Sequence, residues 1–191
     1  MTDKATLRRQ LRRRRMAVPA AERKRAERLV AARLRPLLRR GMRLAAYVAL
    51  GSELSLEPLI SLAQARGVAV YLPVVPRRGR RMRFAALADP HGVWRRNRYG
   101  IREYHARKLI SARALDMVLL PLVGFDAQGG RLGQGGGYYD TTFAFRAHRQ
   151  QWKKPRLWGV GFECQRVAAI PREPHDAPLD GVVSEAALYR A

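Results

Sequence analysis

Apolar runs of strand length alternate with amphipathic helical segments along this chain, and that order limits the folds open to it. Buried strands are expected at 43–49 and 116–120, and further strands at 68–72, 83–87, 157–162 and 181–184. Helices are expected at 56–65 and 138–149, with two more near the N-terminus. The segments 77–83 and 91–107 are expected to be loops, the first of them a solvated basic turn. The pattern predicts an α/β fold around a mostly parallel sheet.

The two N-terminal helices are expected to be amphipathic and basic. Thr2 or Asp3 can cap a first helix over about 3–16, and a second is expected over 20–40, where Pro36 bends or ends it. The first 43 residues hold 16 basic and 3 acidic side chains. Each helix therefore combines an apolar stripe, which can pack on the sheet, with a dense arginine face.

The length and composition are those of one soluble globular domain. With 191 residues, of which 47% are hydrophobic, the chain can bury a substantial core. Residues 1–191 are expected to form a single monomeric domain on which the basic helices of about 3–40 pack. The sequence has neither the roughly 20 apolar residues of a membrane helix nor a signal-peptide pattern, which predicts a cytoplasmic protein. The single Cys164 cannot form an internal disulfide.

The net charge of +23, from 38 basic and 15 acidic side chains, predicts anionic partners. Such a field binds nucleic acid without sequence preference or steers polyanionic small molecules, and composition does not separate the two. A basic nucleic-acid-binding protein is therefore one hypothesis for the function. Its support is the charge alone, because the basic run over 8–43 has no interleaved aromatic residues for stacking on single strands.

A glycine-rich stretch over 124–140 follows the expected strand at 116–120 and combines the groups that bind a nucleotide phosphate. Its clustered glycines allow positive φ and a close approach of backbone N–H groups to an anion: Gly133, Gly135, Gly136 and Gly137. Arg131 adds a positive charge, and Asp140 can hold a divalent cation. The structural alternative is a glycine-rich surface turn.

The common phosphate-loop patterns do not fit this stretch. A Walker loop needs Gly-Lys-Ser/Thr, which the sequence lacks. In a dinucleotide fingerprint begun at Gly133 and Gly135, the third glycine position is Tyr138. The zinc-hydrolase and serine-hydrolase motifs are also absent from the sequence. Chemistry that depends on nicotinamide, on zinc or on a serine triad is therefore disfavoured.

From Pro121 to Asp140 the chain resembles the signature of the 5-formyltetrahydrofolate cyclo-ligase (5,10-methenyltetrahydrofolate synthetase) family. The matching order is Pro, apolar residues, Phe-Asp, and then Gly-x-Arg-Leu-Gly-x-Gly-x-Gly-Tyr-Tyr-Asp. The resemblance, which extends from Lys4 to Glu185, implies a three-layer α/β/α domain like those of sugar-phosphate isomerases and CoA transferases. It also implies that ATP and Mg²⁺ drive the cyclisation of 5-formyltetrahydrofolate to 5,10-methenyltetrahydrofolate, with release of ADP and phosphate.

The same resemblance implies which residues act. Contacts to ATP are implied for Lys4, Ala5, Thr6, Leu7, Arg8, Arg131, Leu132, Gly133, Gln134, Gly135, Gly136, Gly137, Tyr138 and Tyr139. Contacts to the folate are implied for Val48, Glu53, Trp94, Gln134, Gly135, Gly136, Gly137 and Tyr138. The catalytic groups are expected to be Lys4, Arg8, Arg131 and Tyr138. The Mg²⁺ contacts are expected to be Asp140 and Asp176.

Several of these assignments have a structural alternative. Lys4 and Arg8, four residues apart on one side of the first helix, can clamp an anion or be solvated surface cations. Glu53 can bind a ligand at the end of a strand or cap the next helix. Trp94 can stack on a folate ring or be a half-buried loop residue. The pair His175-Asp176 can be an ordinary turn.

The chain departs from the family pattern at a few positions. Gly136 and Thr141 stand where basic residues are usual, and Tyr104 stands where proline is usual. The first two departures reduce the number of cations that the resemblance implies around the phosphates.

Overall fold

The computed structural model describes residues 3–98, 100–146, 154–173 and 176–191. Its centre is an eight-stranded sheet in the order β12-β11-β10-β7-β1-β2-β3-β6. Its strands are Arg43–Ala45 (β1), Ala69–Val74 (β2), Arg83–Ala86 (β3), Leu109–Ile110 (β6), Met117–Pro121 (β7), Arg156–Val160 (β10), Gly181–Val183 (β11) and Leu188–Arg190 (β12). The pairings from β11 through β10, β7 and β1 to β2 are parallel, and the other three are antiparallel. The prediction of a mostly parallel sheet is confirmed.

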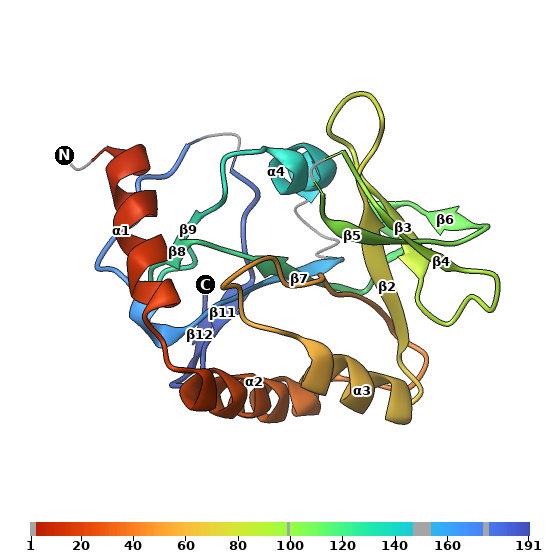
Figure 1. The fold of residues 1–191 in the computed structure, drawn as a ribbon, viewed down its shortest axis with the longest axis horizontal. Coiled ribbons are helices and arrows are strands. Elements are labelled where there is room, and N and C mark those ends of the chain that lie inside the picture. Colours follow the sequence, from red (N-terminus) through yellow and green to blue (C-terminus); the bar gives the residue numbers. More distant parts are fainter. Residues whose placement is uncertain (1–2, 99, 147–153, 174–175) are drawn as a thin grey trace.

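Helices flank this sheet (Figure 1). They are Lys4–Met16 (α1), Ala20–Leu34 (α2), Glu57–Ala65 (α3) and Tyr138–Phe143 (α4), with 3-10 turns at Arg35–Leu37, Ala112–Ala114, Ala144–Arg146 and Glu163–Gln165. Figure 1 shows α2 and α3 side by side below the sheet and α4 above it. The α/β class predicted from the alternation of segments is confirmed.

The buried strands are apolar on both faces because both faces are covered. Successive strand side chains point to opposite faces. In β7, Leu119 packs in the core cluster on the side of the sheet that α2 and α3 cover. Val118 and Leu120 pack in the cluster that includes Phe143 of α4. A continuous apolar run such as 116–120 is therefore the expected sequence of a central strand in this fold.

α1 stands at one end of the sheet (Figure 1) and begins as predicted, because the carboxylate of Asp3 accepts a hydrogen bond from the Ala5 N–H at 3.2 Å. Leu11 is its fully buried apolar side chain and packs against Leu132. The corner between α1 and α2 is closed by Arg23, which donates to the carbonyls of Val18 and Ser52 at 2.9 and 2.7 Å. These contacts fix α1 beside the glycine-rich stretch.

Three predicted elements end at least four residues earlier in the structure. The second helix ends at Leu34, and the chain continues as the 3-10 turn Arg35–Leu37, which contains Pro36. The strand expected over 43–49 is limited to Arg43–Ala45, since the chain then leaves the sheet. The helix expected over 138–149 ends at Phe143 and continues as a 3-10 turn to Arg146, while 147–149 lie outside the described residues.

The prediction of a loop over 91–107 is wrong, because this segment contains an antiparallel hairpin. It comprises Val93–Arg96 (β4) and Arg102–His105 (β5), with Trp94 opposite Tyr104. All four residues of β4 are exposed, so the strand lacks the alternation that identifies a half-buried strand. A second small ribbon pairs Gly124–Phe125 (β8) with Arg131–Leu132 (β9) and begins the glycine-rich stretch.

The basic turn predicted over 77–83 is exposed from Arg77 to Arg81, as expected, while Met82 is buried. Over the described ranges, no helix has the length and apolar composition needed to cross a bilayer.

Candidate functional site

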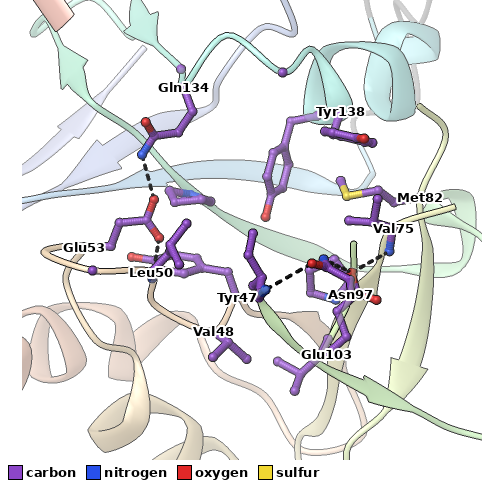
Figure 2. A pocket seen from close by; sticks show the side chains of 18 of the residues that line it. Tyr47, Val48, Leu50, Glu53, Val75, Met82, Asn97, Glu103, Gln134 and Tyr138 are labelled. Atoms are coloured by element: carbon purple, nitrogen blue, oxygen red, sulfur yellow. Dashed lines mark hydrogen bonds between the residues drawn. The ribbon is translucent and has the colours of Figure 1, made fainter. Parts of the chain in front are cut away.

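A cavity of about 850 Å³ opens where β1, β2 and β7 end (Figure 2), at the edge where parallel sheets bind ligands. We call it the apolar cavity, because its lining includes Tyr47, Val48, Leu50, Leu72, Pro73, Val75, Met82, Ile101, Tyr104, Pro121, Tyr138 and Tyr139. Figure 2 shows its polar groups in two sets, with Glu53 and Gln134 on one side and Glu103 and Asn97 on the other. Its volume falls in the range of small-molecule sites, roughly 300–1,000 Å³.

A second cavity, of about 780 Å³, adjoins the glycine-rich stretch. We call it the basic cavity, because its charged lining consists of Lys4, Arg8, Arg80, Arg81 and Arg131 together with Asp140, Glu173 and Asp176. The two cavities share the residues Arg131, Gly133, Gly135, Gly137 and Asp140. The glycine-rich stretch is thus a common wall between an apolar and a cationic compartment.

Only two of the four clustered glycines use the left-handed backbone region. Gly135 has φ 96° and Gly137 has φ 67°, a conformation that side chains with a Cβ rarely adopt. Gly137 is also the residue that precedes the first turn of α4. The expectation of positive φ at Gly133 and Gly136 is wrong, and at Gly136 an added Cβ would lie 3.1 Å from the ring of Tyr138.

Arg131 and Asp140 form an ion pair in the common wall. The side chain of Arg131 is only 5% exposed, and its Nε has no hydrogen-bond partner among the described residues. Asp140 Oδ1 also accepts from the Ala177 N–H at 3.1 Å. A buried N–H without a partner costs about 1–3 kcal/mol, so an acceptor from a bound ligand would stabilise this site.

The structure brings Lys4 and Arg8 to the basic cavity. Lys4 Nζ lies 2.7 Å from Glu173 Oε1 and 4.0 Å from Asp176 Oδ2, and Arg8 Nε donates to the Gly133 carbonyl at 2.9 Å. The intervening residues line neither cavity: Ala5, Thr6 and Leu7. Their implied ATP contacts stay predictions, while the two cations of α1 are placed for such a role.

Glu53 lies at the apolar cavity within a chain of hydrogen bonds that starts on α1. Arg12 Nη2 donates to Gln134 Oε1 at 2.7 Å, and Gln134 Nε2 donates to Glu53 Oε1 at 3.0 Å. Glu53 Oε2 accepts from the Leu50 N–H at 3.0 Å (Figure 2), and Glu53 is 9% exposed. The residue that precedes α3 is Leu56, which makes no side-chain cap, so the alternative of a capping Glu53 is not observed. Val48 lines the same cavity.

Two buried tyrosines of the apolar cavity, Tyr47 and Tyr139, remain protonated at neutral pH. Burial, reinforced by the charge of Glu53, raises the pKa of Tyr47 and of Tyr139 well above the usual phenol value. The Tyr47 hydroxyl donates to the Leu54 carbonyl at 2.8 Å. Burial therefore excludes Tyr47 and Tyr139 as general bases and leaves them as apolar walls with a polar end.

Tyr138 has a different environment from its neighbour. Its hydroxyl accepts a hydrogen bond from Arg98 Nη2 at 3.0 Å, and its ring lies in the wall of the apolar cavity (Figure 2). Leu132, by contrast, lines the basic cavity and packs against Leu11 of α1.

Trp94 is not brought together with the other predicted residues. It lies on β4, is 43% exposed and lines neither cavity. Its ring packs edge-on against Tyr104 at 5.2 Å between centroids, with the Arg102 guanidinium 4.7 Å from the ring centroid. Its contact with folate stays a prediction. Asp176 does reach the basic cavity, while its neighbour His175 lies outside the described residues.

Two further groups at the apolar cavity are not among the site residues predicted from the sequence. Glu103 is 5% exposed and accepts from the Val75 N–H at 3.1 Å and from Asn97 Nδ2 at 2.7 Å. Arg15, also 5% exposed, donates to Ser52 Oγ at 3.0 Å, and burial lowers its pKa. Arg15 belongs to a run of four arginines, and only the tertiary structure shows which one points inward.

The acids of the basic cavity fit Mg²⁺. Asp140 and Asp176 both line it, and Asp176 Oδ2 accepts from the Glu173 N–H at 2.8 Å. Among the described residues, the other oxygens, Asp140 Oδ2 and Asp176 Oδ1, accept no hydrogen bond. Across the described part of the chain, no group of three or more His, Cys, Asp or Glu side chains could hold a metal ion on its own. This arrangement suits Mg²⁺, which prefers one or two carboxylates with substrate phosphates and water.

Comparisons with known proteins agree on one family. Residues 1–185 match the sequence pattern of the 5-formyltetrahydrofolate cyclo-ligase family. The chain is 34% identical over 150 residues to the 5-formyltetrahydrofolate cyclo-ligase of Escherichia coli K12, and the aligned region covers 76% of this chain and 79% of that protein. It is 32% identical over 145 residues to the Haemophilus influenzae protein of the same name, with 74% of each covered.

A solved structure shows the same fold. The 5,10-methenyltetrahydrofolate synthetase of Aquifex aeolicus superposes with a TM-score of 0.78 at 26% identity, over 98% of this chain and 92% of that one.

Proposed function

Because the chain belongs to the 5-formyltetrahydrofolate cyclo-ligase family, whose members are ligases, we propose that it cyclises 5-formyltetrahydrofolate to 5,10-methenyltetrahydrofolate with conversion of ATP to ADP and phosphate. The observation that carries the proposal is the pair of cavities with a common glycine-rich wall. A reaction between an organic ring system and a terminal phosphate needs an apolar and a cationic compartment that meet at one point.

The apolar cavity is the proposed folate site. Its aromatic and aliphatic walls can bury a reduced pterin, and Glu53 and Gln134 provide hydrogen-bonding groups beside the common wall. Tyr138 lies in that wall and can contact the reacting end of the folate.

The basic cavity is the proposed phosphate site. Lys4, Arg8 and Arg131 converge there from two distant parts of the chain, and the unpartnered Arg131 Nε can donate to a phosphate oxygen. Positioning the two substrates at one wall converts their encounter into a step within a single complex.

The proposed chemistry has two steps. The formyl oxygen on N5 attacks the γ-phosphorus, so that an oxygen–phosphorus bond forms and the bond to the ADP oxygen breaks. N10 then attacks the activated carbon and loses its proton, the carbon–oxygen bond breaks, and phosphate leaves with the former formyl oxygen. Bound Mg²⁺ would neutralise charge that builds on the phosphates, and Asp140 and Asp176 are the residues that would hold it.

Both steps depend on charge neutralisation and orientation rather than on a protein nucleophile. The chain provides for this with cations from α1 and the glycine-rich stretch, and with phenols that burial keeps neutral. Cys164 is half-buried, and burial raises its pKa, so its thiol is a poor nucleophile.

The experiment is a spectroscopic assay for the methenyl chromophore with purified protein, 5-formyltetrahydrofolate, ATP and Mg²⁺. Absorbance should appear with all components and should fail when ATP or the folate is left out. Lack of product with the complete mixture, in a protein that is folded by circular dichroism, would contradict the proposal.

Three further expectations accompany the proposed function. The enzyme is expected to be a cytoplasmic monomer, which fractionation and sedimentation can test. Its net charge of +23 also favours weak binding to nucleic acid as a secondary property.

A further inference from the structure

The exposed turn between β2 and β3 contributes two arginines to the basic cavity. Arg80 and Arg81 line it, whereas Arg77 and Arg78 of the same turn line neither cavity. All four side chains are exposed. The turn therefore offers two cations at the cavity and two similar cations away from it.

The turn is held against the glycine-rich stretch by Thr142 of α4. The Met82 N–H, at the end of the turn, donates to Thr142 Oγ1 at 3.0 Å, and this hydroxyl donates to the Tyr138 carbonyl at 2.6 Å. Thr142 is 2% exposed. An added Cβ at Gly137 would lie 3.4 Å from Arg80 Nη1, so the guanidinium of Arg80 lies directly beside the common wall.

The other cations of the basic cavity are already engaged. Lys4 contacts Glu173, Arg8 donates to the Gly133 carbonyl, and Arg131 pairs with Asp140. By contrast, the guanidinium groups of Arg80 and Arg81 have no hydrogen bond or ion pair to any residue that the structure describes.

The basic cavity has a net positive charge. Five cationic side chains and three carboxylates line it, among the described residues. The carboxylates therefore leave an excess of two positive charges. A triphosphate bound with one divalent cation still carries uncancelled negative charge that this excess can neutralise.

We propose that Arg80 and Arg81 bind the polyphosphate of the nucleotide and make the site selective for ATP over nucleotides with fewer phosphates. The proposal rests on the proposed function only in taking the basic cavity as the nucleotide site. Because both side chains are free and long, they can close over the phosphates from the side opposite α1. The bidentate geometry of a guanidinium suits contact with two phosphate oxygens.

The test is equilibrium binding of ATP and of AMP, each with Mg²⁺ and without folate, to the full-length protein. Arg80→Ala and Arg81→Ala should each weaken ATP binding by about fivefold or more, and should change AMP binding less than about twofold. Arg77→Ala and Arg78→Ala, the matched controls in the same turn, should leave both affinities unchanged. Arg80→Gln and Arg81→Gln, which remove the charge but keep a polar side chain, should reproduce the alanine losses.

Wild-type ATP affinity in the Arg80 and Arg81 variants would overturn the proposal, and so would equal losses in all four arginine variants, which indicate a general field. Because folate is omitted, the outcomes for the two proposals separate. A protein that binds ATP with this dependence but forms no methenyl product supports the role of these arginines and contradicts the proposed function.

Discussion

Arg131 and Asp140 form an ion pair that joins β9, within the glycine-rich stretch, to the first turn of α4. Both residues line both cavities. Asp140 neutralises a buried arginine, and in the proposed function it also offers an oxygen to Mg²⁺. The ion pair therefore links the stability of the common wall to the proposed binding of Mg²⁺.

Asp140→Asn is expected to abolish most turnover and also to destabilise the fold. The amide preserves the side-chain volume but leaves the buried Arg131 without its counter-charge, at a cost of about 2 kcal/mol. Turnover should be measured at limiting and at saturating Mg²⁺, together with the thermal unfolding temperature. Unchanged turnover at limiting Mg²⁺ would remove Asp140 from the metal site.

Lys4→Ala and Arg8→Ala should each raise the KM for ATP by about tenfold and leave the KM for folate near its wild-type value, because both cations line the basic cavity only. Arg13→Ala and Arg14→Ala are the controls, since these α1 side chains are exposed and line neither cavity. If all four variants raise the KM equally, α1 contributes a general positive field and the specific clamp is wrong.

Glu53→Gln should raise the KM for 5-formyltetrahydrofolate with little change in the KM for ATP. The buried Glu53 carboxylate accepts hydrogen bonds from the Leu50 N–H and from Gln134 Nε2. A glutamine at this position has no negative charge, and its side-chain nitrogen cannot accept the second of these hydrogen bonds. Glu57→Gln, on the exposed first turn of α3, is the matched control. Steady-state kinetics with each substrate varied in turn make the measurement, and an effect confined to the KM for ATP would contradict the folate assignment.

Asp116 supports the sheet in a pH-dependent way. Partial burial raises its pKa, but hydrogen bonds from Lys154 and from the Arg43 N–H outweigh burial and hold the pKa below the usual value. The carboxylate therefore stabilises the fold above its unfolded pKa of about 3.9 and loses this effect as the pH falls through the folded pKa. Asp116→Asn should lower the free energy of unfolding by about 1 kcal/mol at pH 7.

Denaturant titrations of the wild-type protein and of Asp116→Asn at several pH values would give the difference in their free energies of unfolding. The difference between them should shrink as the pH falls below about 4. A difference that is constant with pH would show that the charge of Asp116 is not what stabilises the pairing of β1.

Binding to nucleic acid should be weak, indifferent to sequence and steeply reduced by salt, because it depends on counterion release. Turnover at saturating substrates should fall much less over the same salt range, since Arg131 and Glu53 in the cavities are buried. Parallel salt titrations of oligonucleotide binding and of turnover make the comparison. Tight, sequence-selective binding at physiological salt would instead establish the nucleic-acid hypothesis as a second function.

The sequence was sufficient to predict the α/β layers of the fold, because its strongest patterns come from buried helices and strands. The central strand β7 is apolar on both faces and was located within one residue, and the start of α1 was marked by Asp3. The hairpin β4–β5 was missed because it is half-exposed and Tyr104, one of its buried residues, contacts Asp89 outside the strands. Local periodicity does not record such contacts.

The residues of the candidate site were also only partly predictable from the sequence. The glycine-rich stretch is contiguous, so its order could be recognised, and the family resemblance directed attention to Lys4 and Asp176 far from it. Arg15 and Arg80 could not be selected, because each is one of several arginines nearby and only the packing determines which of them reaches a cavity.

The central claim is that the two cavities bring the γ-phosphate to the formyl oxygen at their common wall. The most direct measurement uses 5-formyltetrahydrofolate labelled with ¹⁸O in the formyl group and follows the label by mass spectrometry after a single turnover with ATP. Transfer of the phosphoryl group to that oxygen predicts that the released phosphate carries one ¹⁸O atom for each methenyl product. Unlabelled phosphate, with methenyl product formed, would contradict the account.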